Sequence, residues 1–304
     1  MKIVNVIGGL GNQMFQYAFA VALKARCPYE KVYVDTQHYK NAFIKVYHGN
    51  NFYHNGYEID KVFPNASIKP ASAQDLMKVS YYIPNQILAR AVRRLFPKRR
   101  TEFVADQQPY VFLPEVTDIK GDCYFDGYWM TPKYFDAYRD EIIKEFAFRP
   151  FSTKENLAIE PLLKQDNSVT IHIRRGDYVG SSTLGGICTI AYYRNAIREA
   201  RKLISNPAFF VFSNDAKWCM ENLKDVFGDS EVHFVTHNKG NESYRDMQLM
   251  SIACCNILAN SSFSWWGAYL NQRDDHITFC PNKWHNTMVH DEIYPNNWIK
   301  VTTI

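Results

Sequence analysis

Short apolar runs alternate with amphipathic stretches from the first residues of the chain. Residues 2–7 (KIVNVI) are typical of a buried strand, and residues 8–13 (GGLGNQ) predict a loop after it. Residues 14–26 have apolar positions at helical spacing, and residues 31–35 (KVYVD) predict the next strand. This strand–loop–helix–strand opening indicates a parallel sheet.

The pattern becomes regular after residues 148–156, which predict a domain boundary. The predicted strands are 168–174, 208–215, 231–238, 256–260 and, as the last one, 276–281; the predicted helices are 191–204, 243–255 and 261–271. Such alternation is typical of a doubly wound α/β domain. We therefore expect two domains, at residues 1–150 and 151–304.

The region between these two patterns is harder to interpret, because residues 40–125 show weak periodicity. A helix is predicted from Pro132 to residue 148, with Phe135, Ile142 and Phe146 facing inward.

A second helix is predicted in this region over residues 87–95. One arc of this helix is apolar and contains Ile87, Leu88, Ala91, Val92 and Leu95. The opposite arc is basic and contains Arg90, Arg93 and Arg94. More basic residues follow at 98–100. The helix is interpreted either as a surface helix with a solvated basic face, or as a basic helix (87–100) at an anionic membrane surface or charged acceptor.

Composition narrows the function classes. Lys and Arg exceed Asp and Glu by only 35 − 31 = 4, which does not indicate a nucleic-acid binder. The seven cysteines are odd in number and form no C-x-x-C pair, so neither a disulfide framework nor a zinc ribbon is expected, and a reducing cytoplasm is the simplest compartment. We expect no signal peptide and no membrane span.

The most informative polar residues follow predicted strands, because ligands of such sheets bind beyond the strands' carboxyl ends. In residues 168–178 (SVTIHIRRGDY), His172 shares a face with Arg174, and Arg174 and Arg175 end the strand. A guanidinium matches a phosphate bidentately, so these arginines predict a phosphate site. The alternative is an arginine pair tied to carboxylates such as Asp177.

Three further strand ends or helix starts carry candidate ligand groups. Ser261, Ser262 and Ser264 open a predicted helix, whose N–H groups favour phosphate; the alternative is ordinary N-capping. In residues 212–215 (FSND), Ser213 and Asp215 follow a strand, and Asp246 lies near a helix start. These carboxylates are interpreted either as partners of a nucleobase or ribose, or as caps and solvated charges.

The glycine-rich residues 8–13 resemble a dinucleotide fingerprint, but Met14 occupies the position that needs a small residue. Gly11 still lets backbone approach a ligand, and Asn12 and Gln13 offer polar groups. No D-x-D triplet exists. The histidines and acids at 285–292 fit no standard metal spacing, so a surface tail is expected there.

Together these stretches resemble the alpha-1,2-fucosyltransferases, glycosyltransferase family 11, a GT-B family that uses GDP-fucose. The resemblance is carried by HIRRGDYV, GGLGNQMFQYAFA, DGYWMTPKYF, FSND and DMQLMSIACCNILANSSFSWWGAYLN, in the family's order. More distantly, the HxRR and strand–SS–helix features resemble the alpha-1,6- and protein O-fucosyltransferases.

The resemblance implies an α/β GT-B fold with two Rossmann-like domains facing a cleft, the first binding the acceptor and the second GDP-fucose. It implies that Arg174 binds the departing β-phosphate with support from Arg175. It further implies that His172 and Asp246 address guanosine, that Ser261 and Ser262 contact phosphate, and that Asn12 lies near the glycosidic oxygen.

The implied reaction is an inverting, metal-independent transfer of L-fucose to the 2-hydroxyl of a terminal galactoside, with no cofactor besides the donor substrate. Asp177 is a candidate general base and Asp126 another. The rival hypotheses are a nicotinamide-dependent oxidoreductase, a non-catalytic nucleotide- or glycan-binding protein, and a transferase with another donor sugar. The expected partners are GDP-fucose and a galactose-terminated oligosaccharide, in the cytoplasm or peripherally at the inner face of the membrane.

Overall fold

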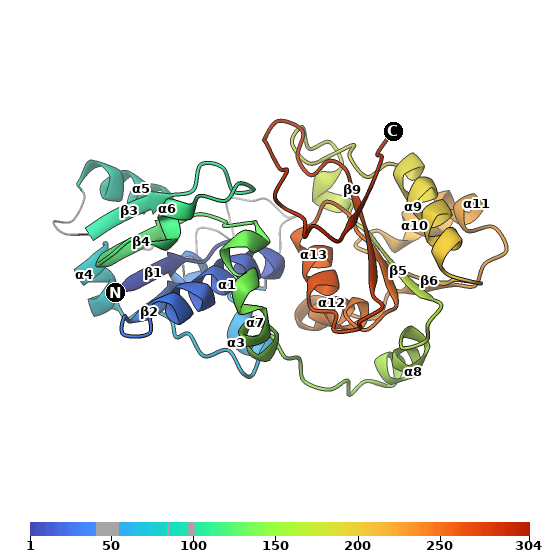
Figure 1. Ribbon diagram of the computed structural model, residues 1–304, viewed down its shortest axis with the longest axis horizontal. Coiled ribbons are helices and arrows are strands. Elements are labelled where there is room, and N and C mark those ends of the chain that lie inside the picture. Colours follow the sequence, from blue (N-terminus) through green and yellow to red (C-terminus); the bar gives the residue numbers. More distant parts are fainter. Residues whose placement is uncertain (41–54, 84, 97–100) are drawn as a thin grey trace. The chain divides into compact units, whose positions relative to one another are not determined.

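A computed structural model describes residues 1–40, 55–83, 85–96 and 101–304 (Figure 1). The chain forms two compact units, described separately below. The first comprises Met1–Phe148 with Asp291–Ile293, and the second Arg149–His290 with Tyr294–Ile304. The three-residue segment that joins the first unit had no signal in the sequence. Residues 285–292 were expected to be a surface tail, but Ile293 beside them is fully buried and Glu292 accepts from Lys133 and the Phe112 amide.

The first unit is built on a parallel sheet of order β2-β1-β4-β3. Its strands are β1 (Lys2–Asn5), β2 (Val32–Asp35), β3 (Thr101–Ala105) and β4 (Asp122–Asp126). The long helix α1 (Leu10–Arg26) packs on β1 and β2, and α4 (Ala73–Val79) packs on β1 and β4. All four residues of β1 are buried, because helices cover both faces of the sheet.

Aromatic side chains fill this unit's core, which is the structural explanation for much of the aromatic content. Phe19 stacks on Trp129 with ring centroids 4.6 Å apart and meets Tyr134 edge-on at 5.2 Å. Phe135 and Phe146 are buried as predicted. The single helix expected from Pro132 is wrong. The chain forms short 3-10 turns η3 (Pro132–Tyr134) and η4 (Asp136–Tyr138) before α7 (Arg139–Glu145), because Phe135 between the turns has a φ of −139°, outside the helical range.

Helix α5 (Gln86–Leu95) forms where predicted but faces the other way. Ile87, Leu88 and Leu95 are 79%, 54% and 69% exposed, whereas Arg93 is 4% exposed. The predicted basic outer face is therefore wrong for Arg93, which is buried, whereas Arg90 pairs with a carboxylate of the sheet and stays 48% exposed. Contact of this helix with an anionic membrane stays a prediction. The basic residues 98–100 lie outside the described residues.

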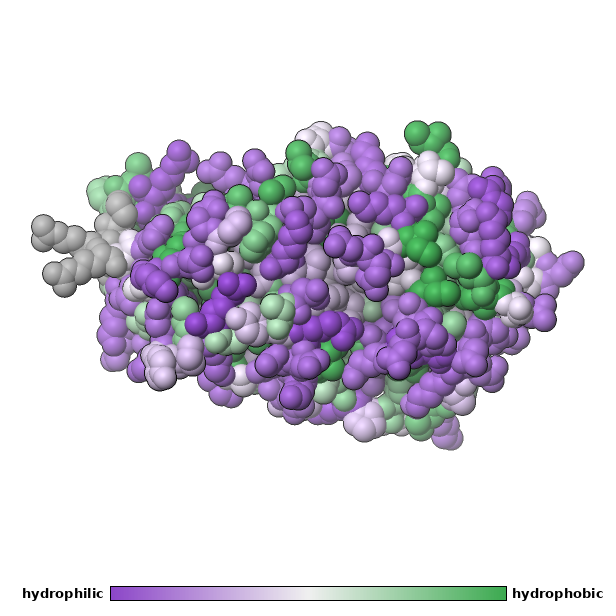
Figure 2. Space-filling view, viewed as in Figure 1, coloured by the Kyte–Doolittle hydropathy of each residue, from purple (hydrophilic) through white to green (hydrophobic). Residues whose placement is uncertain are grey.

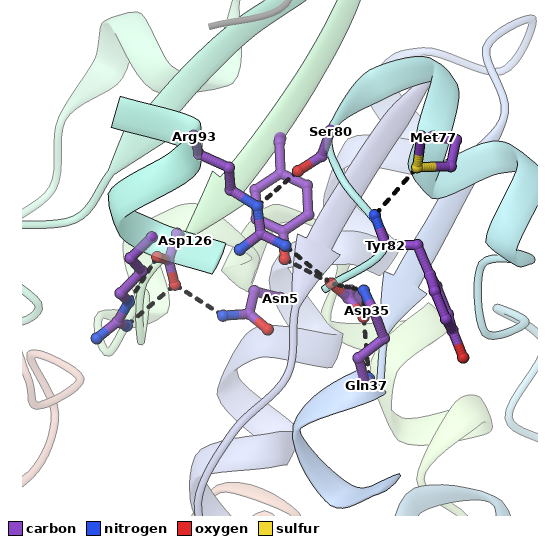
Figure 3. A network of polar contacts seen from close by, with 10 residues as sticks. Asn5, Asp35, Gln37, Met77, Ser80, Tyr82, Arg93 and Asp126 are labelled. Atoms are coloured by element: carbon purple, nitrogen blue, oxygen red, sulfur yellow. Dashed lines mark hydrogen bonds and ion pairs between the residues drawn. The ribbon is translucent and has the colours of Figure 1, made fainter. Parts of the chain in front are cut away.

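Two carboxylates at strand ends explain this orientation (Figure 3). Arg93 reaches Asp35 at the end of β2 (Nη2–Oδ2 3.4 Å), also contacts Ser80, and lies 3.9 Å above the Tyr124 ring. Arg90 forms two hydrogen bonds, of 2.7 and 3.0 Å, with Asp126 at the end of β4. A buried carboxylate needs such partners, since leaving it unpaired costs several kcal/mol, about 3–5 when a buried pair is broken.

The second unit is built on a larger parallel sheet of order β10-β9-β8-β5-β6-β7. Its strands are β5 (Ser168–Ile173), β6 (Ala208–Ser213), β7 (Val232–Val235), β8 (Cys255–Ile257), β9 (Ile277–Pro281) and β10 (Ile299–Val301). Its helices are α8 (Lys154–Leu163), α9 (Ile190–Leu203), α10 (Ala216–Asn222), α11 (Lys224–Phe227), α12 (Tyr244–Met250) and α13 (Ser262–Tyr269). The remaining short helices are α3 (Ile59–Val62) and α6 (Pro114–Thr117) in the first unit. The predicted α/β class with two Rossmann-like parallel sheets, as a GT-B enzyme requires, is confirmed.

Two sequence predictions fail in this sheet. The helix expected over 243–255 ends at Met250. The side-chain amide of Asn256 donates a hydrogen bond to the Met250 carbonyl (2.9 Å), and Cys255 is already the first residue of β8. Strand β9 is not the last strand, since Ile299–Val301 pairs beside it; three residues are too few to show a period.

The sequence predicted no disulfide framework, no metal site and no membrane-spanning segment. All seven cysteines are free thiols. Within the described residues no helix is both long and apolar enough to cross a bilayer, and no group of three His, Cys, Asp or Glu could hold a metal. The compartment stays a prediction.

Because Arg93 pairs with the buried Asp35, replacing Arg93 should destabilise the protein much more than replacing the adjacent Arg94. Arg93→Ala leaves the Asp35 carboxylate, 2% exposed, without its cation and is expected to lower the free energy of unfolding by about 3–5 kcal/mol. The exposed neighbour Arg94 is the matched control. Arg94→Ala is expected to change the free energy of unfolding by no more than about 0.5 kcal/mol. Urea unfolding of both variants measures this. Equal effects of the two substitutions would contradict the assigned role of the pair.

Candidate functional site

The carboxyl ends of three neighbouring strands gather most of the residues predicted from the sequence. Strand β5 pairs with β6 and β8 in parallel, with Ile173 opposite Ser213 and Ile171 opposite Ile257. The residues that follow β5, β6 and β8 therefore share one edge of the second unit's sheet. All six residues of β5 are buried, so Arg174 is the first side chain of this segment that can reach solvent.

Arg174 is held by a carboxylate of its own turn. Its Nη2 lies 2.7 Å from Oδ1 of Asp177, and its side chain remains 33% exposed. The turn is the 3-10 segment η5 (Gly176–Tyr178). It requires glycine at position 176, where φ is +44° and a Cβ would run into the Asn214 amide. The contact is an ion pair without hydrogen-bond geometry, since Asp177 Oδ1 has no hydrogen-bond partner among the described residues.

Arg175 is oriented by the segment after β6. Its Nε donates to Asp215 Oδ2 at 3.1 Å, and its guanidinium carbon lies 3.7 Å from the centre of the Trp218 ring. The same Asp215 caps α10 by accepting from the Trp218 amide at 3.2 Å, while the Ser213 hydroxyl accepts from the Asp215 amide at 3.0 Å. The structure thus shows the carboxylate pairing that was the alternative to a phosphate site. Both arginines are nevertheless placed at the sheet edge.

The two arginines line a pocket of about 280 Å³. Its wall includes the segment from Tyr178 to Ile190, together with Trp218 and Asn260. The sequence analysis missed Asn260. Its amide Nδ2 donates to the carbonyls of Leu184 and Trp284, both at 3.1 Å, and thereby fixes this wall. Asn260 directly precedes Ser261, and this position in the sequence could have identified it as a candidate site residue.

His172 is buried next to Arg174. Burial, and secondly the charge of Arg174, lowers its pKa to about 3, so the ring is neutral at pH 7. Its Nδ1 is buried without a hydrogen-bond partner among the described residues, and the ring lies 5.7 Å from the Phe263 ring. A buried polar atom without a partner is unusual in a folded protein and is a reason to expect a ligand there.

Asp246, on the first turn of α12, has an unusual protonation equilibrium. Burial raises its pKa to about 7, although a hydrogen bond from Asn238 (2.8 Å) opposes the shift. Asn238 is joined in turn to Asn156 (2.9 Å), which also bonds the His237 ring at 2.8 Å. The sequence analysis missed these amides. An aspartate that titrates near neutrality is a candidate functional residue.

Helix α13 begins at the same edge without a side-chain cap. Ser261 occupies the N-cap position, but its hydroxyl accepts no backbone hydrogen bond from the first turn. The capping alternative is therefore not observed at Ser261. The Ser264 hydroxyl instead donates back to the Ser261 carbonyl at 3.3 Å. The first N–H groups of the helix, beginning with Ser262, give this edge a positive dipole end.

The glycine-rich candidates belong to the first unit, and the loop expected over 8–13 is wrong because α1 already begins at Leu10. Gly11 and Asn12 are therefore in its first turn. Gly8 has φ +83°, and a Cβ there would meet the Asn12 amide at 2.8 Å. Gln13 is fully buried and donates to the carbonyls of Gly8 (3.0 Å) and Gly56 (2.8 Å), which fixes the turn before the helix.

Asp126 was an alternative general base. It is 5% exposed, and besides Arg90 it accepts from the Asn5 amide at 2.7 Å. With its oxygens occupied by an arginine and an amide, Asp126 is poorly placed to take a proton from a hydroxyl.

The two units and the polar edge define an α/β protein in which two arginines line a pocket at the carboxyl ends of the strands, where ligands of such sheets bind. The model of the family described as glycosyl transferase family 11 matches residues 115–302. An Escherichia coli alpha-1,2-colitosyltransferase is 32% identical over 98% of each chain. The chain therefore belongs to glycosyl transferase family 11, and the resemblance inferred from its sequence is confirmed.

Two further comparisons cover smaller or more distant likenesses. A mouse galactoside alpha-(1,2)-fucosyltransferase 2 is 30% identical over 48% of this chain and 44% of its own length. The crystal structure of a Bradyrhizobium fucosyltransferase, NodZ, aligns over 88% of this chain and 91% of its own with a TM-score of 0.48 and 17% identity.

The raised pKa of Asp246 predicts a pH-dependent stability difference. Between the usual aspartate pKa and about 7, the folded carboxyl holds a proton that the unfolded chain lacks, so this group's contribution to stability falls as pH rises through that range. Asp246→Asn removes the titration. As pH rises from 4 to 7, we expect the free energy of unfolding of this variant to increase relative to that of the parent protein, by at most about 1.4 kcal/mol per unit of pKa shift.

Melting temperatures of both proteins across that range measure the difference, in which the contribution of His172 cancels. Asp229→Asn, at an exposed position, is the control and should show no pH-dependent difference. A flat difference for Asp246→Asn would show that its carboxyl is not shifted.

Proposed function

We propose that the protein transfers L-fucose from GDP-β-L-fucose to the 2-hydroxyl of a terminal galactoside, with inversion and without a metal ion. The observation that carries the proposal is the placement of Arg174 and Arg175 at a sheet edge where α13 begins without a side-chain cap. Family membership supports glycosyl transfer, and the names of the E. coli and mouse relatives support the α-1,2 linkage.

The proposed chemical step is displacement of GDP from C1 of the sugar. As the C1–O bond breaks, the β-phosphate gains negative charge and the sugar becomes oxocarbenium-like. A guanidinium already held in place stabilises this charge without reorganising at that moment. We assign this role to Arg174, oriented by Asp177, and a supporting role to Arg175, oriented by Asp215.

The remaining residues are assigned to the nucleotide. The unpartnered Nδ1 of His172 and the Asp246 carboxyl suit the donors and acceptors of guanosine. The hydroxyls and first N–H groups at Ser261 and Ser262 suit phosphate. Ser213 accepts a hydrogen bond from the Asp215 amide and thereby supports the carboxylate that orients Arg175.

In this proposal residues 151–304 bind the donor and residues 1–150 bind the acceptor, with Asn12 serving the glycosidic oxygen and Gly11 letting the backbone approach the donor. Asp177 is the candidate general base, since Asp126 is occupied by Arg90 and Asn5. Using it as a base requires its pair with Arg174 to open when the phosphate arrives.

One observation favours a second candidate function. The E. coli relative that matches 98% of this chain is named as a colitosyltransferase, whereas the mouse fucosyltransferase matches 48% of it. The donor sugar could therefore be colitose instead of fucose, at the same nucleotide site and with the same arginine chemistry.

A product assay tests the function and distinguishes the donors. The protein is incubated with a β-galactoside and either GDP-fucose or the corresponding colitosyl donor, with and without EDTA. We expect an α-1,2-linked fucosyl product by linkage analysis, at a rate that EDTA leaves largely unchanged. Faster turnover of the colitosyl donor would favour the second candidate. Nucleotide binding without any product would leave a non-catalytic binding protein.

Substitution of the leading arginine tests the mechanism. Arg174→Ala is expected to lower kcat by roughly 10²–10³, as removal of a single transition-state donor does in other enzymes. Steady-state kinetics separates kcat from KM, and the loss should fall mainly on kcat. The control is Arg273→Ala, because Arg273 pairs with Asp166 and Asp275 on the surface and should leave kcat unchanged. Near-normal turnover of Arg174→Ala would remove the assigned role.

A further inference from the structure

Exposed apolar side chains concentrate on one helical hairpin of the first unit. The described residues include 14 large hydrophobic side chains that are exposed, and six of these lie between positions 77 and 96. We refer to them as the α4–α5 apolar face: Met77, Tyr82, Ile87, Leu88, Leu95 and Phe96. Hydrophobic residues show at the α5 end of the first unit in Figure 2.

The residues of this face belong to two helices and to the described part of their connection. Ile87, Leu88 and Leu95 recur at the spacing of one helical stripe. The Tyr82 amide donates to the Met77 sulfur at 3.3 Å (Figure 3), and the Tyr81 hydroxyl donates to the Phe96 carbonyl at 2.7 Å. These bonds tie the connection between α4 and α5 to both helices.

The inward side of α5 explains why the helix cannot turn over to bury its leucines. Arg90 and Arg93 hold the Asp126 and Asp35 carboxylates of the sheet. Rotation of the helix would break both ion pairs, one of them almost fully buried. The outward apolar stripe is therefore fixed by the sheet, and its exposure is a permanent feature of this unit.

Charge identifies the occupant of this face. From Met77 to Phe96 the sequence contains four Lys or Arg and no Asp or Glu. Arg93 is buried and the half-exposed Arg90 is paired with Asp126, whereas Lys78 and Arg94 are exposed beside the apolar residues. Exposed Leu, Ile and Phe flanked by cations are the features of a helix that lies in the headgroup region of an anionic bilayer.

We propose that the α4–α5 apolar face docks on an anionic lipid surface, with its apolar side chains at the headgroup–acyl boundary and Lys78 and Arg94 against acidic headgroups. A second copy of the chain fits this face less well. It would place like charges opposite each other, and six side chains are few beside the 20–30 residues a side of a standard interface.

Vesicle binding by the full chain tests the proposal. Sedimentation is compared for vesicles of phosphatidylcholine alone and of phosphatidylcholine mixed with phosphatidylglycerol. We expect binding to the mixed vesicles that weakens as salt is raised. The double variant Leu88→Ser, Leu95→Ser and the single variant Arg94→Glu should each bind about tenfold more weakly or worse.

The matched control is Leu203→Ser on α9, which removes a side chain of similar exposure (57%) from the other unit. It should bind like the parent. Turnover of a water-soluble acceptor should be unchanged in all variants, because none of these residues belongs to the proposed site. Absence of vesicle binding, or equal binding by the double variant, would overturn the proposal. So would a concentration-dependent dimer that the double variant abolishes while vesicle binding stays absent.

Discussion

Strands that are buried on both faces can present polar groups only where they end, and this constraint organises both units. Strand β5 is buried along its whole length, so two consecutive guanidinium groups appear at its carboxyl end. Adjacent like charges at the rim of a core need anions. The chain supplies Asp177 from the following turn and Asp215 from the neighbouring strand's end. The candidate site is therefore an edge of the sheet where two protein carboxylates hold two guanidinium groups in place.

The same constraint decides the orientation of α5 in the first unit. Burying an exposed leucine or isoleucine is worth about 1.5–3 kcal/mol, so the apolar stripe alone favours the orientation expected from the sequence. Against this, breaking a buried ion pair costs about 3–5 kcal/mol, and two carboxylates, Asp35 and Asp126, would lose arginines. Helical periodicity could not reveal this balance, because the deciding charges lie far away in sequence, at the ends of β2 and β4.

Features that depend on neighbours along the chain could be predicted from the sequence, and features that depend on distant partners could not. The strands up to Asp35 and Ile173, and the polar residues after them, follow from local apolar runs and the rule for parallel sheets. The end of α12 was missed because it depends on Asn256 capturing a carbonyl after the helix. The pocket wall was missed because Asn260 binds carbonyls 76 and 24 residues away.

The ion pair between Arg174 and Asp177 connects structure to mechanism. In the proposed function, the ion pair with Asp177 holds the guanidinium in place and so removes rotamer freedom that would otherwise be lost when the donor phosphate binds. A pyrophosphate carries more charge than the carboxylate and presents more acceptor oxygens, so it can compete for the guanidinium N–H donors. Asp177 then either keeps its ion pair with Arg174 and acts as a positioning residue, or loses the ion pair, which leaves one carboxylate oxygen able to accept a proton. Because the second course couples release of the carboxylate to arrival of the donor, a base would become available only in the loaded enzyme.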